Sequence, residues 1–562
     1  MKKLIFLLIT LNCYSQSISL NEENLINRIR LNQLKGELDT NYSFNIRPIE
    51  IGNFGLNFSE EEKETFFFPK LASFFSDKAE IRLLPINTTL EFNSHHPYNR
   101  NNGSMIPNRG YQHRISFGFF SKIGPLTIQI NPEHLYSENK NYDGFWEGHY
   151  PIIWAKRYNL WNHIDIPERF GENSHNQFLI GQSSVKLNLK GFSLGISNEH
   201  LWWGPSLRNS IMMSNHARGF KHITLNTTRP QKTPIGFFEF QLVSGRLEAS
   251  GFTPPNPDYV YAGSKLYVPK INQIPEVDDW RYFQGLVISY TPKWFENISL
   301  GLIRWVQMYS AQVEGRYYWM VGKPSYFPIF NNLFRKNDLY ENYEAQTDQA
   351  GGVFFKWRWP NSNAEIYSEF HLNDTRQNLR DLLLDSDHSR AVTIGIRKLF
   401  DFKNSNLLFE WEWTQLEQTK GRVLRNAGSW YEHLWIYHGY TNYGEVIGAG
   451  IGPGSNSNYF SLKKLNDNER YGIAFEIIDQ DNDFYYDAFD SSNDYRRYWK
   501  DFNFHFNFEK DLKRFLISGN FIYSRSLNYQ WELDDYIQPY YHPGKDVNNF
   551  HMTLKVLYKL ID

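Results

Sequence analysis

The sequence lacks several features that would place it in common protein classes. Its 562 residues include one cysteine, Cys13, which lies within an N-terminal export signal. If that signal is removed, the mature chain has no thiol, which excludes cysteine nucleophiles, disulfides and thiolate metal sites. No stretch of the chain approaches the length of a membrane helix, which needs about 18 consecutive apolar residues. The formal net charge is -2 without a sustained basic patch, which argues against nucleic acid as a partner.

Motifs that mark common enzymes are also missing. The chain has neither a G-x-S-x-G elbow nor an H-E-x-x-H helix. Its 17 histidines show no compact ligand spacing, and His95–His96 is interpreted as a surface pair in a loop. We therefore expect no enzyme activity, no cofactor and no metal site.

Aromatic residues, in contrast, are abundant, with 17 Trp, 36 Tyr and 44 Phe. The most informative segment is 407–414, because a strand points alternate side chains to opposite faces. One face would carry aromatic rings and the other polar groups: Phe409, Trp411 and Trp413 against Glu410, Glu412 and Thr414. A transmembrane barrel strand needs this arrangement, since lipid wets one face and water the other.

The same alternation recurs from about residue 82 to the end of the chain. It is clear in segments 84–93, 111–119, 364–371, 502–509 and 550–560. The mean hydropathy of -0.56 is compatible with a barrel, because half of each barrel strand is polar. The alternatives are a large soluble β-sandwich or a propeller, and the propeller is disfavoured by the lack of a fixed-period repeat. The sequence predicts an all-β transmembrane barrel of more than a dozen antiparallel strands.

Residues 1–15 read as a signal peptide. Lys2 and Lys3 precede an apolar core at 4–11, and a small-x-small site at 13–15 precedes Gln16. A lipoprotein anchor at Cys13 is an alternative, but Asn12 before it is a poor match. Export combined with barrel patterning predicts the outer membrane of a diderm bacterium.

Residues 16–79 are predicted to form a periplasmic N-terminal segment that packs beneath or into the barrel, with a soluble linker as the alternative. It would begin with a helix over 21–38, capped by Asn21. An extended piece at 43–51 and a charged, Phe-rich piece at 60–75 follow. Residues 80–562 would form one barrel with short Gly/Pro turns at one end. Long external loops are expected at 93–109, 134–176, 253–282 and 320–350.

The segment 198–222 is the densest in groups that bind sugars. Indole rings stack on pyranose rings, while planar donors bind hydroxyls and the carboxylates of acidic sugars. The predicted polysaccharide-binding residues are Trp202, Trp203, Arg208, Asn209, Asn215 and His216. Two structural interpretations remain open: an aromatic girdle with Arg208 as a strut in the lumen, or a turn that folds into the barrel at Gly204.

Three further patterns have weaker functional readings. The glycine-rich run 448–454 lacks the helix that a dinucleotide loop requires, so a tight loop against the wall or in the lumen is expected. The acids at 479, 481 and 483 suggest calcium, but Phe484 occupies the glycine position of an EF-hand loop, which favours a hairpin end with exposed acids. Glu410 with Glu412, or Glu432 with Asp483, could form a glycosidase pair, although acids facing a barrel lumen are common.

These motifs together resemble the Wzi-type capsule assembly proteins, in the branch found in Bacteroidetes-like bacteria. The strongest match is Leu-Trp-Trp-Gly-Pro at 201–205 with Arg-Asn-Ser at 208–210. Other matches lie in order along the chain, at 94–98, 103, 106–107, 124–126, 129, 132–133, 214–215, 220–222, 225–227, 439–441, 444–445, 452–456 and 481–486. The chain departs from many barrels in ending at Asp562 rather than phenylalanine, and the family's binding residues cannot be carried over individually.

The resemblance implies an outer-membrane β-barrel of about eighteen strands with a small periplasmic helical part. It also implies a lectin-like, non-catalytic role in holding capsular or exopolysaccharide at the cell surface. The expected partners are surface polysaccharide, outer-membrane lipid and, during biogenesis, the barrel-assembly machinery. A porin or transport channel is the main alternative function, and an accessory scaffold of a surface-assembly or secretion complex is the second.

Overall fold

The computed structural model describes most of the chain beyond the export signal. The described residues are 15–38, 41–52, 70–74, 79–270, 280–313, 327–330, 347–373, 379–403, 405–425, 427–492, 497–532 and 544–560. Most of the predicted signal peptide, part of the Phe-rich piece at 60–75 and most of the predicted loop 320–350 lie outside them. The helices are α2 (Glu23–Leu34), α4 (Pro151–His163), α6 (Ser310–Val313), α8 (Leu379–Leu384) and α9 (Asn482–Asp490). Short 3-10 turns are η1 (Leu20–Glu22), η2 (Pro328–Phe330), η3 (Pro360–Ser362), η4 (Lys420–Val423) and η5 (Tyr529–Trp531).

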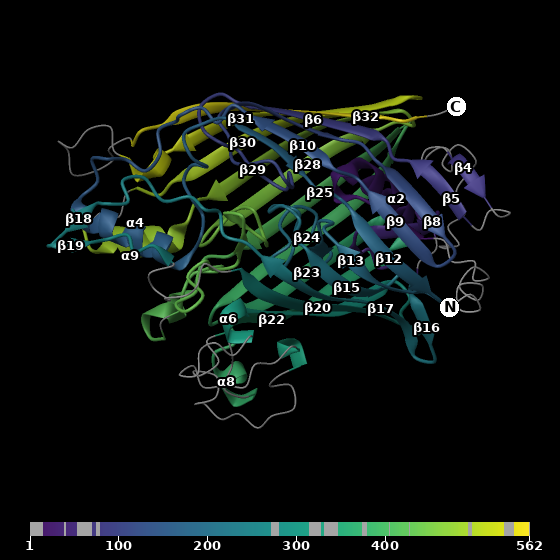
Figure 1. The fold of residues 1–562 in the computed structure, drawn as a ribbon, viewed down its shortest axis with the longest axis horizontal. Helices are drawn as coiled ribbons and strands as arrows, with labels where there is room; N and C mark the ends of the chain where they lie inside the picture. The colour runs from purple at the N-terminus through teal and green to yellow at the C-terminus, as the bar shows by residue number, and fades with distance from the viewer. Residues whose placement is uncertain are drawn as a thin grey trace.

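One antiparallel sheet of 24 segments dominates the fold (Figure 1). Its first part contains β4 (Lys70–Phe74), β5 (Ala79–Leu83), β6 (Ile86–Asn93), β7 (Gly110–Ser116), β8 (Phe119–Ile123), β9 (Leu126–Ile130), β10 (Glu133–Ser137), β11 (His175–Leu179), β12 (Ser184–Leu189), β13 (Phe192–Ser197), β15 (His222–Thr227) and β16 (Gln231–Thr233). Its second part contains β17 (Gly236–Leu247), β20 (Arg281–Pro292), β21 (Ile298–Tyr309), β22 (Asp348–Trp359), β23 (Ala364–Asn373), β24 (Arg390–Phe402), β25 (Ser405–Gln415), β28 (Asn456–Leu465), β29 (Glu469–Asp479), β30 (Lys500–Leu512), β31 (Phe515–Leu527) and β32 (Val547–Tyr558).

The sheet closes on itself as a barrel, because β32 pairs with β6 from His551 opposite Asn93 to Tyr558 opposite Ile86. In five cases two consecutive segments form one interrupted strand, because both pair with the same neighbouring strand. These pairs are β5 with β6, β7 with β8, β9 with β10, β11 with β12, and β15 with β16. Each of these pairs counts as one strand, and β4 is not counted because it forms a hairpin with β5. The 24 segments therefore amount to eighteen strands within the described residues. This matches the strand number that the resemblance implied.

The predicted alternation is confirmed residue by residue. Along β25 the rings of Phe409, Trp411 and Trp413 are partly exposed on the outer face, whereas Glu410 and Glu412 are buried on the inner face. On β30, Phe504 and Phe506 face outward between buried Asn503 and His505. In these two strands the outward faces are apolar and the inward faces mostly polar, as a wall between lipid and a polar interior requires.

Protein fills much of the barrel interior. Residues of the N-terminal segment, including Ile26, Ile29 and Phe44, form a buried apolar cluster that also contains Trp202. A larger cluster combines residues of α4, α9 and the loops with inward residues of the strands. Four two-stranded sheets lie outside the barrel sheet: β1 (Ser15–Ile18) with β3 (Ile49–Gly52), β2 (Ile46–Arg47) with β14 (Trp202–Trp203), β18 (Val260–Tyr261) with β19 (Ser264–Lys265), and β26 (Thr441–Asn442) with β27 (Glu445–Val446).

The N-terminal helix differs from its predicted form. Helix α2 ends at Leu34, and a 3-10 turn precedes it, so the regular helix is shorter than the predicted 21–38. Asn21 does not cap the helix: Ser19 caps the 3-10 turn, where its Oγ accepts a hydrogen bond from the Asn21 N–H at 3.1 Å, and Glu22 precedes α2 without a side-chain capping bond. The sheet also includes Lys70–Phe74, which precedes the predicted barrel boundary at residue 80.

The two ends of the barrel differ in their connections. Figure 1 shows α4, α9 and the β18–β19 hairpin gathered at one end, and both termini with the hairpin strands β4, β5 and β16 at the other. In outer-membrane barrels the short turns face the periplasm and the long loops face outward, which assigns the α4–α9 end to the cell exterior. None of the described helices is both long enough and apolar enough to cross a membrane.

A charge placed on the lipid-facing wall tests the fold. Phe506 lies outward at the middle of β30, and Phe515 lies outward at the start of β31, beside a turn. Phe506→Arg should lower the free energy of unfolding in lipid vesicles by about 2–4 kcal/mol, and Phe515→Arg by only about 0–1 kcal/mol. Urea unfolding followed by tryptophan fluorescence measures both. Equal costs for the two variants would contradict the membrane depth assigned to these strands.

Candidate functional site

The segment 198–221, here called the lumenal loop, leaves the wall after β13 and folds into the barrel before β15. Its turn at Gly204 requires glycine, because φ is +108° and a Cβ atom would lie 2.3 Å from the Glu369 carboxylate. Glu369 on β23 accepts hydrogen bonds from the Ser206 N–H at 3.1 Å and the Ile211 N–H at 3.4 Å. The chain therefore turns directly against a wall carboxylate.

A second wall carboxylate, Glu412 on β25, binds the next residues of the loop. It accepts N–H groups of Leu207 at 2.7 Å and Asn209 at 2.8 Å, with Arg208 N–H at 3.2 Å. These hydrogen bonds satisfy both the backbone N–H groups and the buried carboxylate. A hydrogen bond to a charged group is also stronger than one between two neutral groups. Glu412 was one member of the glycosidase pair considered above, and its carboxylate is occupied by these contacts.

Arginines of the N-terminal segment hold the other side of the same turn. Arg30 of α2 donates to the Pro205 carbonyl at 3.0 Å. Arg47 of β2 donates to the carbonyls of Gly204 at 3.2 Å and Ser206 at 3.1 Å. All four charged groups at this turn are buried. The loop is thus clamped between cations of the N-terminal segment and anions of the wall.

The two tryptophans of the predicted site are buried. Trp202 is 4% exposed, pairs with Arg47 across the β2–β14 ladder, and lies under its guanidinium at 4.6 Å. Trp203 is 0% exposed, and its indole N–H donates to Gln241 at 2.8 Å. Its ring packs on Gly285, where a Cβ would come within 2.6 Å. Neither ring offers a free face to a sugar in this conformation.

The polar members of the predicted site also have partners within the protein. The guanidinium of Arg208 forms an ion pair with Glu476 on β29 at 3.0 Å and lies 4.0 Å over the Tyr459 ring. Its side chain keeps 24% exposure, and it borders an internal cavity. Asn209 is buried and anchored through its N–H to Glu412, as described above. Of these two residues, Arg208 retains access to solvent.

Asn215 and His216 lie deeper along the lumenal loop. Asn215 donates through its side-chain amide to the Asn101 carbonyl at 3.1 Å. Burial, reinforced by Arg100, lowers the pKa of His216 to about 3, so this ring is neutral at physiological pH. Burial likewise lowers the pKa of His200 to about 4. The two histidines of the loop are therefore buried and neutral, and do not act as cations for an acidic sugar.

The structure thus brings the six predicted residues onto one in-folded loop, as the turn interpretation anticipated. Their contribution to polysaccharide binding stays a prediction. The 448–454 run lies beside this loop in the interior, as expected: Ala449 and Ile451 are buried, and Gly450 packs against His216.

The acids near residue 481 were interpreted wrongly as an exposed hairpin end. They form the start of α9: the Asp481 carboxylate accepts the Phe484 N–H at 3.1 Å, and Asp483 is buried and accepts hydrogen bonds from Ser429 and Gln418. Asp and Glu at a helix start are stabilised by its unpaired N–H groups. Within the described residues, no group of three His, Cys, Asp or Glu side chains has the geometry of a metal site.

An accessible group of aromatic and charged side chains lies instead on α9 and its neighbours, and we call it the loop platform: Lys156, Arg422, Tyr486, Asp487 and Tyr498. Tyr498 is 39% exposed, and its ring meets that of Tyr486 edge-on at 6.0 Å. Arg422 lies 5.1 Å over the Tyr486 ring, and Lys156 of α4 pairs with Asp487 at 2.9 Å. Exposed rings beside charged donors and acceptors are what a sugar ring with hydroxyl groups requires.

Sequence reasoning missed the loop platform because its residues come from three distant segments. Only the Asp481 to Tyr486 motif signalled the region, and it was interpreted through its acids rather than its tyrosines. The helical character of α9 would have placed Tyr486 beside Asp483, one turn earlier on the same face.

Comparison with known proteins identifies the family. A family model described as capsule assembly protein Wzi matches residues 93–484. The chain belongs to the Wzi capsule assembly family. No curated protein matches its sequence significantly.

One solved structure confirms the fold. Wzi of Escherichia coli, described as an outer-membrane protein involved in group 1 capsule assembly and as a carbohydrate-binding β-barrel, aligns with 97% of this chain and 100% of its own. The TM-score is 0.56 at 11% identity. OccAB2 of Acinetobacter baumannii and OprD of Pseudomonas aeruginosa each align at TM-score 0.39 and 8% identity, covering 87% and 88% of this chain and 100% of their own. The predicted outer-membrane β-barrel is confirmed by the Wzi alignment.

Truncation of Trp203 separates an architectural role from sugar binding. Removing a buried indole should cost about 3–5 kcal/mol, so we expect Trp203→Ala to reduce the amount of heat-modifiable, assembled barrel in the outer membrane. Trp294→Ala is the control, because Trp294 is 68% exposed in a short turn, and it should assemble normally. If Trp203→Ala assembles at wild-type levels while capsule is shed, the indole binds sugar.

Proposed function

We propose that this Wzi family protein holds capsular or exopolysaccharide at the outer surface of the cell without chemically altering it. The observation that carries the proposal is the loop platform, where exposed Tyr498 and partly buried Tyr486 lie beside Arg422, Lys156 and Asp487 at the exterior end. Membership of the capsule assembly family supports the proposal, as does the carbohydrate binding ascribed to Wzi of Escherichia coli.

The filled interior supports retention at the surface over passage through the barrel. The lumenal loop, the N-terminal segment and the 448–454 run occupy the space inside the strands. A glycan on the α4–α9 end would therefore meet side chains of the loops rather than an open lumen.

The proposal includes the route and the surroundings of the protein. Residues 1–15 would direct export and be removed, residues 16–79 would enter the barrel from the periplasm, and the outward aromatic faces would contact outer-membrane lipid. Barrel-assembly machinery would insert the chain. The six residues of the lumenal loop would contribute to glycan retention by fixing the shape of the loops that carry the platform.

Deletion of the gene should release capsule into the medium while its synthesis continues, and a platform variant should reproduce part of that effect. Loss of one stacked ring costs roughly 1–3 kcal/mol by analogy with bases on aromatic platforms, so Tyr498→Ala should shed more capsule than the wild type. Capsule in the cell-bound and medium fractions is quantified at matched levels of assembled protein.

Tyr261→Ala provides the matched control. Tyr261 is 37% exposed at the same end of the barrel, within the β18–β19 hairpin and outside the platform, and its truncation should leave capsule retention unchanged. Equal retention in the Tyr498→Ala strain and the wild type, or shedding by Tyr261→Ala alone, would contradict the assignment of the platform.

A further inference from the structure

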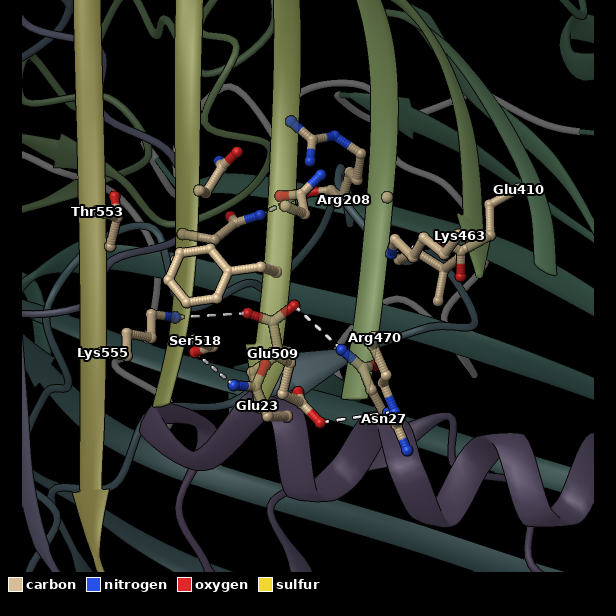
Figure 2. Close-up of a pocket in the computed structure, with 18 of the residues that line it drawn as sticks. Glu23, Asn27, Arg208, Glu410, Lys463, Arg470, Glu509, Ser518, Thr553 and Lys555 are labelled. Atoms are coloured by element: carbon tan, nitrogen blue, oxygen red, sulfur yellow. Dashed lines mark hydrogen bonds and ion pairs between the residues drawn. The ribbon is translucent and has the colours of Figure 1, made fainter. Parts of the chain in front are cut away.

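A cavity of about 270 Å³ lies inside the barrel between α2 and the wall. Figure 2 shows it above the helix, with Thr553 and Lys555 of β32 on one side and Glu410 and Lys463 on the other. Arg208 of the lumenal loop borders it at the far end from α2. The volume is just below the range of small-ligand sites, about 300–1,000 Å³, which suits one or two sugar rings.

Amide side chains form a substantial part of the polar lining, alongside charged side chains. Six asparagines border the cavity, from α2, from the segment before β7 and from the wall: Asn24, Asn27, Asn101, Asn102, Asn507 and Asn520. Hydroxyl groups of Ser518 and Thr553 lie between them. An asparagine side chain donates two hydrogen bonds and accepts two, and each sugar hydroxyl both donates and accepts. The lining therefore matches a polyhydroxylated ligand.

Two of these amides have acceptor capacity that the protein does not use. Asn101 donates through Nδ2 to the Arg208 carbonyl at 2.6 Å, and Asn102 donates through Nδ2 to the Glu91 carboxylate at 3.2 Å. The Oδ1 atoms of both are buried without a hydrogen-bond partner among the described residues. Both residues border the cavity, and because buried polar atoms are normally paired, a ligand hydroxyl that reaches these oxygens would supply the missing donor.

Most charged groups around the cavity have an oppositely charged partner, whereas Arg100 donates to backbone carbonyls and Glu91 accepts from amide side chains. Lys463 pairs with Glu410 at 2.7 Å, Lys555 with Glu23 at 3.7 Å, and Arg470 with Glu509 at 3.5 Å. Arg208 is held by Glu476, as described above. A multiply charged anion would have to break these pairs or lie beside their carboxylates. A neutral ligand pays no such electrostatic cost.

Solvent reaches the cavity beside α2. The side chains of Glu23, Lys463 and Lys555 are 49%, 30% and 28% exposed, although all three border the cavity. The opposite end is covered by Leu207 and Arg208 of the lumenal loop, whose backbone is fixed to Glu412. Access therefore lies on the side of the helix that faces the terminal end of the barrel (Figure 1).

We propose that this cavity is a second binding site, which takes a neutral mono- or disaccharide entering beside α2. The site is separate from the loop platform and does not depend on surface retention of capsule. In it, the Oδ1 atoms of Asn101 and Asn102 accept hydroxyl protons, and the amides of Asn27 and Asn507 close the site from the helix and from the wall.

Calorimetric titration of the purified full chain tests the proposal. The detergent should be an amine oxide, because a maltoside detergent presents a neutral disaccharide itself. The probes are lactose, maltose, cellobiose, digalacturonate and inorganic phosphate. We expect at least one of the three neutral disaccharides to bind with a Kd of about 1 mM or tighter, and digalacturonate and phosphate to bind at least about tenfold more weakly.

Asn27→Leu and Asn507→Leu fill the cavity from opposite sides, and each should weaken binding of that disaccharide at least about tenfold. Asn32→Leu is the matched control, on the same helix but outside the cavity lining, and should change the Kd less than about twofold. Absence of binding by all three neutral disaccharides overturns the proposal, and so does tighter binding of digalacturonate.

A photoactivatable form of the bound disaccharide locates the binding site on the wild-type chain, so the result does not depend on whether the variants fold. Cross-links to α2 or to β28–β32, located by peptide mass spectrometry, support the cavity. Cross-links confined to the loop platform overturn it and leave the surface-retention proposal standing.

Discussion

The structure depends on charge held on both sides of one buried turn. Wall carboxylates of Glu369 and Glu412 bind the N–H groups of residues 206–209, while Arg30 and Arg47 bind carbonyls of residues 204–206. Backbone groups inside a barrel must be paired, because leaving one buried and unpaired costs free energy comparable to a lost hydrogen bond. This clamp keeps the lumenal loop in the interior and links the N-terminal segment to the wall.

The other features follow from that clamp. With the loop held inward, Trp203 is buried against Gly285, and Arg208 reaches Glu476 at the border of the internal cavity. The lumen is occupied, so the α4–α9 end offers loop side chains to the exterior in place of an opening. A carbohydrate-retaining protein of the Wzi family needs such a surface, whereas a porin or channel needs an open lumen.

Much of the fold was predictable because strand alternation is a local property. The period-two pattern of 407–414 placed Glu410 and Glu412 inside and Trp411 outside correctly, and the closing strand was visible at 550–560. The site was less predictable, since its contacts are long-range: Leu207 and Glu412, which hold it inward, are 205 residues apart. Sugar-compatible residue types at 202–216 therefore suggested a binding site, but could not show that Trp202, Trp203 and Asn209 are buried on an in-folded loop. The short helices α4 and α9 were hidden in segments interpreted as a loop and a hairpin.

Planar-bilayer recording of the purified protein tests the central claim that wall carboxylates keep the lumen filled. The account predicts no steady conductance for the wild-type chain. It also predicts openings in the double variant Glu369→Gln and Glu412→Gln, because the lumenal loop then loses its charged acceptors. Glu469→Gln, which alters only surface contacts with Lys510 and Tyr471, should stay closed. A stable open conductance in the wild type would contradict the clamp and favour a channel.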